Sequence, residues 1–170
     1  MKQKIKLAVH EAYTAMYETL KDEQIYAVVL VTDSDCGSLY LTMGTEKSLL
    51  QIGENYQDDP ENFRFLKDEF LHESDTDLIR KMSHELFDRV DHADNALDAD
   101  EQYAAHIVEI HEAMSDAMYE LKQEGIIDEN IFALISVTDD EDEERLEITS
   151  AKRCNPNHPL LPAFLLNWRQ

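Results

Sequence analysis

Carboxylates gathered in two short segments are the residues whose types come nearest to supporting chemistry. Asp33 and Asp35 follow one apolar run, and Asp139, Asp140 and Asp142 follow another. Carboxylate oxygens are the ligands that Ca²⁺ and Mg²⁺ prefer. Neither segment has EF-hand spacing, because Gly37 comes too early and the bidentate glutamate is missing. We therefore expect these turns to hold no metal and the chain to carry no cofactor.

Histidine and cysteine side chains offer other kinds of site. A zincin site needs two histidines four residues apart, whereas His106 and His111 are five apart and point about 140° away from each other on a helix. His10 and His111 flank the apolar faces of their helices, which favours a packing role. Cys154 and His158 have the types of a nucleophile and a base, but the loop between them fixes no geometry. Since a G-x-S-x-G elbow and a phosphate loop are also absent, no catalytic residue can be assigned.

The elements that must position these residues occur twice. A helical pattern containing HEAYTAMYE (10–18) precedes the apolar run IYAVVLVTD (25–33), and HEAMSDAMYE (111–120) precedes IFALISVTD (131–139). Alternating segments follow each run, LYLT (39–42) and LEIT (146–149). The unbroken β-branched runs are typical of central strands, and the short acidic connections favour hairpins with antiparallel partners. We predict two helix-strand-strand units, at about 3–44 and 101–152.

A helical insertion, 45–100, separates the two units. Thr45 is placed to cap one helix, and Ser74, Asp75 and Thr76 offer caps for a second helix whose apolar face spans Leu78 to Val90. The polar stretch 91–100 is expected to be a connection.

The last segment, 153–170, is an apolar tail with Pro162 at an expected first helical position. Phe164 and Trp168 on this tail must be covered, and they could build a homodimer.

Length and composition place these elements in one α+β domain, 1–170, with helices packed on an antiparallel sheet. The chain has 170 residues, with 15 Lys and Arg against 37 Asp and Glu, which gives a formal charge of -22. That charge opposes nucleic acid. No apolar run is long enough for a membrane span. Two unpaired cysteines suit a reducing compartment, so we expect a cytoplasmic protein.

Several of these segments together resemble an uncharacterised bacterial family, the domain of unknown function 4303. The similarity lies in IYAVVLVTDSD followed by GTEKSLL, in the EGII that ends the second long helix, and in ISVTDDEDEERLEITSAKRCNP. The chain departs from the family in its middle, where YQDDPENFRFLKDEF (56–70) has no tryptophan. The resemblance implies an accessory role, of the immunity type in some members, and it supplies no catalytic residue.

Charge, the missing catalytic constellation and the family resemblance together favour a non-enzymatic interaction protein, such as an acidic immunity-type inhibitor of a basic toxin. The residues expected to meet a basic partner are Asp139, Asp140, Asp142, Glu143 and Glu144. The alternative is a small metal-dependent hydrolase that uses clustered Asp and His from the turns and from 91–100.

Overall fold

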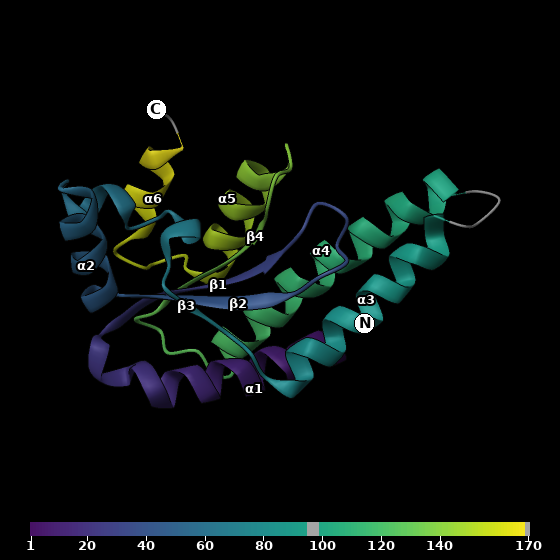
Figure 1. Ribbon diagram of the computed structural model, residues 1–170, viewed down its shortest axis with the longest axis horizontal. Coiled ribbons are helices and arrows are strands. Elements are labelled where there is room, and N and C mark those ends of the chain that lie inside the picture. Colours follow the sequence, from purple (N-terminus) through teal and green to yellow (C-terminus); the bar gives the residue numbers. More distant parts are fainter. Residues whose placement is uncertain (95–98, 169–170) are drawn as a thin grey trace.

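The computed structural model describes residues 1–94 and 99–168, in which a mixed sheet lies between two sets of helices (Figure 1). The helices within these residues are α1 (Lys2–Leu20), α2 (Glu46–Tyr56), α3 (Asp77–Asp94), α4 (Ala99–Gln123), α5 (Glu143–Cys154) and α6 (Leu161–Asn167). The strands are β1 (Ile25–Thr32), β2 (Tyr40–Thr45), β3 (His72–Glu73) and β4 (Phe132–Val137). Short 3-10 turns cover Lys21–Glu23, Pro60–Phe63 and Lys67–Glu69.

The sheet has the strand order β3-β2-β1-β4 and is buried on both faces. Along β1, Val28 and Leu30 face a core formed with α1, α3 and α4, whereas Val29 and Val31 face a second core formed with α2 and α6. Strands covered on both sides need apolar residues at every position, which explains the unbroken runs. The α+β class expected from the sequence is confirmed.

The expectation of a purely antiparallel sheet is wrong, because β1 and β4 are parallel. Ala27 pairs with Phe132 and Thr32 with Val137, while β2 pairs with β1 antiparallel. Two parallel strands cannot be joined by a hairpin and need a crossover; here α3 and α4 lie between β2 and β4 in the chain. The strand order also places β4 at an edge of the sheet, although its unbroken apolar run predicted a central strand.

The predicted strand 146–149 is also wrong, since these residues belong to helix α5. Four alternating residues are too few to exclude a helix, and the buried positions Leu146, Ser150 and Cys154 recur every four residues. The second unit thus ends in a helix where the first ends in β2, and the likeness of the two copies stops after a helix and a strand.

Helix α5 and the residue that follows it, Asn155, cover the edge of β4 with side-chain hydrogen bonds. The N–H of Ala133 donates to Asn155 Oδ1 (2.9 Å), and Asn155 Nδ2 donates to the Ala133 carbonyl oxygen (2.6 Å). The N–H of Ile135 donates to Ser150 Oγ (3.0 Å). These bonds satisfy backbone groups that an open edge would expose to another chain.

Replacing Asn155 by alanine should therefore lower the free energy of unfolding by about 2 kcal/mol, because a buried N–H and a buried carbonyl oxygen lose their partner. Asn155 is 3% exposed. The control is Asn157→Ala at an exposed neighbouring position. Urea denaturation checks the difference, and equal losses in the two variants would contradict the role of Asn155.

The insertion 45–100 is not wholly helical. Thr45 caps α2 as predicted, with its side chain accepting from the Ser48 N–H at 3.0 Å. However, the insertion also supplies β3, which pairs with β2. Of the expected polar connection 91–100, α3 extends to Asp94 and α4 begins at Ala99, and 95–98 lie outside the described residues.

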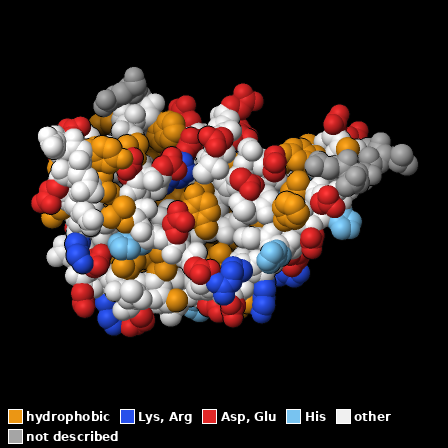
Figure 2. All heavy atoms as spheres, viewed as in Figure 1, with side chains coloured by type: hydrophobic (Ala, Val, Ile, Leu, Met, Phe, Trp, Pro, Cys, Tyr) orange, Lys and Arg blue, Asp and Glu red, His pale blue; other side chains and the backbone are white. Residues whose placement is uncertain are grey.

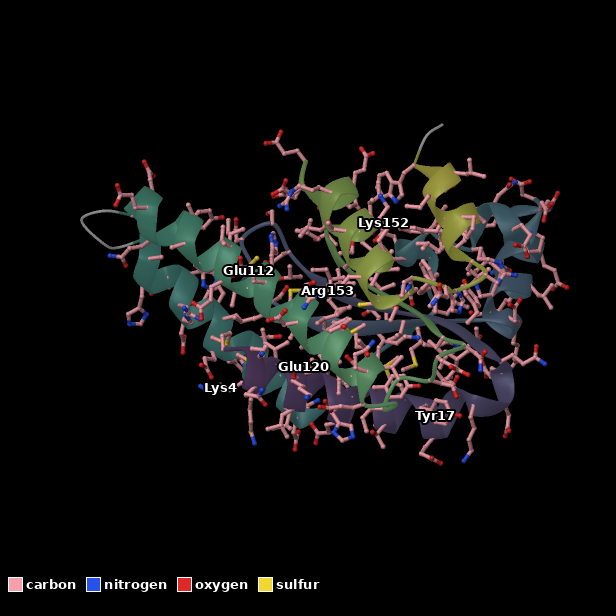
Figure 3. The ribbon with its side chains drawn as sticks, turned by 180° about the vertical axis from the view of Figure 1, so that it is seen from behind. Lys4, Tyr17, Glu112, Glu120, Lys152 and Arg153 are labelled. Carbon is pink, nitrogen blue, oxygen red and sulfur yellow. The ribbon has the colours of Figure 1, made fainter. Side chains whose placement is uncertain are left out.

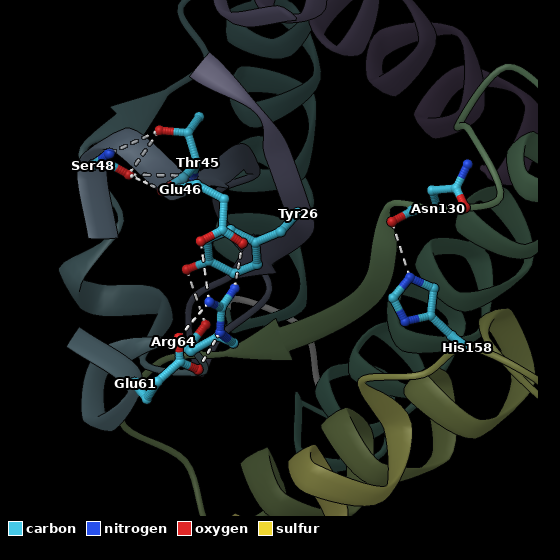
Figure 4. A network of polar contacts seen from close by, with 8 residues as sticks. All are labelled: Tyr26, Thr45, Glu46, Ser48, Glu61, Arg64, Asn130 and His158. Carbon is cyan, nitrogen blue, oxygen red and sulfur yellow. Dashed lines mark hydrogen bonds and ion pairs between the residues drawn. The ribbon is translucent and has the colours of Figure 1, made fainter. Parts of the chain in front are cut away.

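Arg64 links the middle of the insertion to the sheet through polar contacts and a contact with an aromatic ring (Figure 4). Its guanidinium group lies 4.7 Å from the centroid of the Tyr26 ring and pairs with Glu46 at 2.7 Å and Glu61 at 2.5 Å. The Tyr26 hydroxyl donates to the Arg64 carbonyl oxygen at 3.0 Å. This network holds the segment before β3 against β1 and α2.

Pro162 lies in the first turn of α6 as predicted. Phe164 is 1% exposed and packs against Phe65 and Phe132 of the same chain. Phe164 is thus covered by residues of its own chain, and the homodimer stays a prediction.

Candidate partner-binding surface

Parallel pairing of β1 and β4 brings the two acidic segments to one edge of the sheet. The N–H of Thr138 donates to the Thr32 carbonyl oxygen at 3.0 Å, which extends the pairing into both turns. We call 33–39 and 138–144 together the carboxyl edge. These two segments hold eight Asp and Glu residues and no Lys or Arg.

The first turn of the carboxyl edge is held by Asp33. Its Oδ1 accepts from the Gly37 N–H at 2.7 Å, and its carbonyl oxygen accepts from the Cys36 N–H at 3.0 Å. Cys36 is buried in a left-handed conformation with φ 52°. Burial raises the pKa of the Cys36 thiol to about 12, so the thiol stays protonated and is no nucleophile.

The second turn is organised by Asp140, and it connects β4 to α5 instead of forming the predicted hairpin tip. Asp140 Oδ1 accepts from the Asp142 N–H at 2.7 Å. Asp142 pairs with Arg145 at 2.7 Å, and Glu143 pairs with Lys67. Of the five residues predicted to meet a partner, Asp139, Asp140 and Glu144 form no ion pair within the described residues.

Other Lys and Arg residues form ion pairs between helices away from the two turns; Figure 3 labels Glu120 and Arg153 among them. Glu120 of α4 pairs with Lys2 and with Lys6 of α1, both at 2.9 Å. Arg153 of α5 pairs with Asp116 of α4 at 2.7 Å. Figure 2 shows Asp and Glu over the whole visible face, including the top, whereas most of the visible Lys and Arg lie along the lower border. Within the described residues, ion pairs with Arg145 and Lys67 engage two of the eight carboxylates of the carboxyl edge, so the edge keeps an excess of negative charge.

Helix α4 supports the first turn through His106, whose Nε2 lies 3.1 Å from the Cys36 carbonyl oxygen. The Tyr103 hydroxyl also donates to the Asp35 carboxylate. His111, one turn further along, is buried, and burial lowers its pKa. His10, its counterpart in the first copy, is exposed. The two histidines therefore do not share an environment.

Cys154 and His158, the residues with the types of a nucleophile and a base, form no hydrogen bond with each other within the described residues. Cys154 is buried, and burial raises its pKa to about 11. His158 Nε2 instead contacts the Asn130 carbonyl oxygen at 3.0 Å (Figure 4). Within 1–94 and 99–168, no group of three or more His, Cys, Asp and Glu side chains could hold a metal ion.

Sequence reasoning missed a buried polar cluster beneath the carboxyl edge. Glu147 is 4% exposed and accepts from Ser136 Oγ at 2.6 Å. Burial raises the pKa of its carboxyl group to about 7, and Lys67 acts in the opposite direction. A strand over 146–149 would place Glu147 on the face opposite Leu146, whereas the helix buries both side chains. The four-residue spacing of Glu143 and Glu147 would have placed both on one helical face.

Fold and surface together define an acidic α+β domain with a mixed sheet and a carboxylate-rich edge. The chain belongs to the family described as Domain of unknown function (DUF4303), whose model matches residues 5–156. This match confirms the resemblance seen in the sequence. Comparison with curated proteins and with solved structures gave no match. No helix in the described part of the chain is long and apolar enough to cross a membrane.

Proposed function

We propose that this chain is a non-enzymatic interaction domain that binds a basic protein at the carboxyl edge. The observation that carries the proposal is the meeting of two acidic turns beside paired strands, with eight carboxylates and no Lys or Arg in the two segments. Asp35, Asp139, Glu141 and Glu144 are exposed there. Such a surface attracts a cationic partner and speeds its encounter.

A basic toxin or nuclease is one class of protein with the required charge. Toward such a partner the chain would act as an immunity-type inhibitor in the bacterial cytoplasm. Both cysteines are buried as protonated thiols. This agrees with a role in binding, since neither thiol is set up to act as a nucleophile.

Neutralising three carboxylates should weaken association with the partner. The variant combines Asp139→Asn, Asp140→Asn and Glu144→Gln, which keep hydrogen-bond acceptors and spare the ion-paired Asp142 and Glu143. Exposed charges at an interface contribute about 0.2–1 kcal/mol each, so we expect about a tenfold loss of affinity. The partner is first captured from the native host and purified, and calorimetry at increasing salt then gives the dissociation constants.

The matched control removes three exposed charges outside both turns, with Asp22→Asn, Glu54→Gln and Glu129→Gln. This control should bind as the wild type does. Affinity that does not fall as salt rises would refute the proposal, and so would an equal loss in both triple variants.

A further inference from the structure

A buried carboxyl group beneath the carboxyl edge shares a cation with that edge. Glu147 of α5 is 4% exposed, and its carboxyl group accepts from Ser136 Oγ of β4 at 2.6 Å. Glu143, one turn earlier in the same helix, belongs to the carboxyl edge and pairs with Lys67. The Lys67 side chain is 6% exposed, and its charge also acts on Glu147. One buried ammonium group therefore serves a carboxylate of the edge and the carboxyl group below it.

Glu147 forms no ion pair of its own within the described residues. The 3-10 turn before β3 places Asp68 3.5 Å from Lys67, so this ammonium group is already divided between carboxylates. Strand β2 brings only the Tyr40 hydroxyl near Lys67, and burial raises the pKa of that hydroxyl. The end of α6 brings the Trp168 indole N–H, a neutral donor that lowers the pKa of Glu147, and α6 itself has no titratable residue.

Helix α4 also packs on α5 and brings one titratable group close to the edge. The charges of Asp140 and Asp142 act on His111 of this helix, but burial is the larger effect and lowers its pKa below 6.5. Loss of the His111 proton and loss of the Glu147 proton both make the region more negative as pH rises. The two titrations must therefore be separated by a variant.

Ionisation of Glu147 changes the balance of charge at the edge. While Glu147 holds its proton, Lys67 neutralises Glu143. Once the proton is lost, the same ammonium group faces a second carboxylate, and the net charge of the cluster falls by one. Lys67 stays charged in both states, because burial lowers its pKa less than the surrounding carboxylates raise it. Water and salt screen buried charges less than exposed ones, so the added charge is felt at the surface above.

We propose that the Glu147 proton regulates the carboxyl edge, so that loss of the proton strengthens binding of a basic partner, an inference that rests on the function proposed above. The sign follows from charge, because a cationic partner stabilises the ionised carboxyl group and not the neutral one. By linkage, binding of the partner then promotes release of the proton. Burial raises the pKa of Glu147 to about 7, which places the change between about pH 6 and 8.

The test uses an octa-arginine peptide with both ends capped as the basic probe, since its charge stays constant from about pH 5.5 to 8.5. Titration calorimetry at low salt gives its dissociation constant across this range. We expect the affinity of the wild type to rise about two- to fivefold with pH, the effect of one added charge at an interface. Glu147→Gln should lose this rise, and its difference from the wild type isolates Glu147 because both proteins contain His111.

The matched control is Glu144→Gln, on the exposed side of the same helix. This variant also removes one carboxylate, so it should bind the peptide more weakly at every pH while it keeps the rise. A rise of the same size in the wild type and in Glu147→Gln would overturn the inference.

A second measurement needs only the wild type and covers the case in which Glu147→Gln does not fold. At neutral pH the wild type should release about 0.2–0.4 proton for each peptide bound, the amount that follows from a two- to fivefold linkage. Calorimetry in MOPS and in imidazole detects this release, because the two buffers differ in their enthalpy of ionisation. Equal binding enthalpies in the two buffers would mean that no proton is released and would contradict the inference.

The triple variant of the carboxyl edge separates this inference from the proposed function. If that variant loses affinity for the peptide but the affinity of the wild type does not change with pH, regulation by Glu147 alone fails. If that variant binds the peptide as tightly as the wild type does, the carboxyl edge is not the binding surface, and the proposed function fails together with its regulation.

Discussion

Replacing Phe164 by alanine is expected to lower the free energy of unfolding by about 3–5 kcal/mol, the range for removing a buried aromatic ring. Phe164 is 1% exposed, and its ring centroid lies 5.4 Å from that of Phe65 and 5.3 Å from that of Phe132. Its ring joins α6, the insertion and β4 in one core. Truncation leaves a cavity among three elements that are far apart in the sequence.

The matched control is Leu166→Ala in the same helix, at a position that is 56% exposed. This variant loses a similar apolar side chain without a cavity, and its stability should change by less than about 0.5 kcal/mol. Urea denaturation followed by circular dichroism gives both values. Equal losses would mean that α6 is not docked through Phe164.

Glu147 should make the protein less stable as pH rises between about 4.5 and 7. Burial raises the pKa of its carboxyl group from 4.5 to about 7 in the folded protein. In this pH range the folded state holds a proton that the unfolded chain has released, so the free energy of unfolding falls with pH. A shift of that size corresponds to about 3 kcal/mol, present in full below pH 4.5 and lost above pH 7.

Glu147→Gln should remove this pH dependence, because the amide keeps an acceptor for Ser136 without a titrating group. The quantity to measure is the difference in unfolding free energy between wild type and variant from pH 4 to 8, since other groups then cancel. Glu144→Gln, on the exposed side of the same helix, controls for the loss of a surface charge. A difference that stays constant across this range would rule out the raised pKa of Glu147.

Local patterns predicted the individual elements well. The periodicity of α1 and α4, the Thr45 cap and the apolar runs of β1 and β4 all depend on neighbours within a few residues. Gly125 follows α4 with φ 72°, as a left-handed helix stop requires. Such features are readable because the physics that fixes them is local.

Pairing between distant strands could not be predicted in the same way. Whether β4 lies parallel or antiparallel to β1 depends on the path of α3 and α4, which the residues of β4 do not encode. The misassigned segment 146–149 has a similar cause, since Ser150 and Asn155 bond an edge of β4 that exists only in the assembled sheet. In the sequence alone, nothing distinguishes the Ser150 hydroxyl and the Asn155 amide from other polar side chains.

The candidate surface was only partly visible in the sequence. Acidic residues in 138–144 were evident, but their meeting with Asp33 and Asp35 follows from the parallel pairing. The ion pairs of Asp142 with Arg145 and of Glu143 with Lys67 are likewise known only from the structure. They separate these two carboxylates from the other three predicted residues, which form no ion pair within the described residues. The contact of His106 with the Cys36 carbonyl oxygen also joins segments that are far apart in the sequence.

The rate of association with the purified basic partner tests the role of the carboxyl edge most directly. Stopped-flow measurements compare the wild type, the edge triple variant and the charge-matched control triple variant at low and at physiological ionic strength. We predict association about tenfold slower for the edge variant at low salt, with little change in dissociation and a smaller difference at physiological salt. Association rates that are the same for all three proteins at low salt would contradict the account.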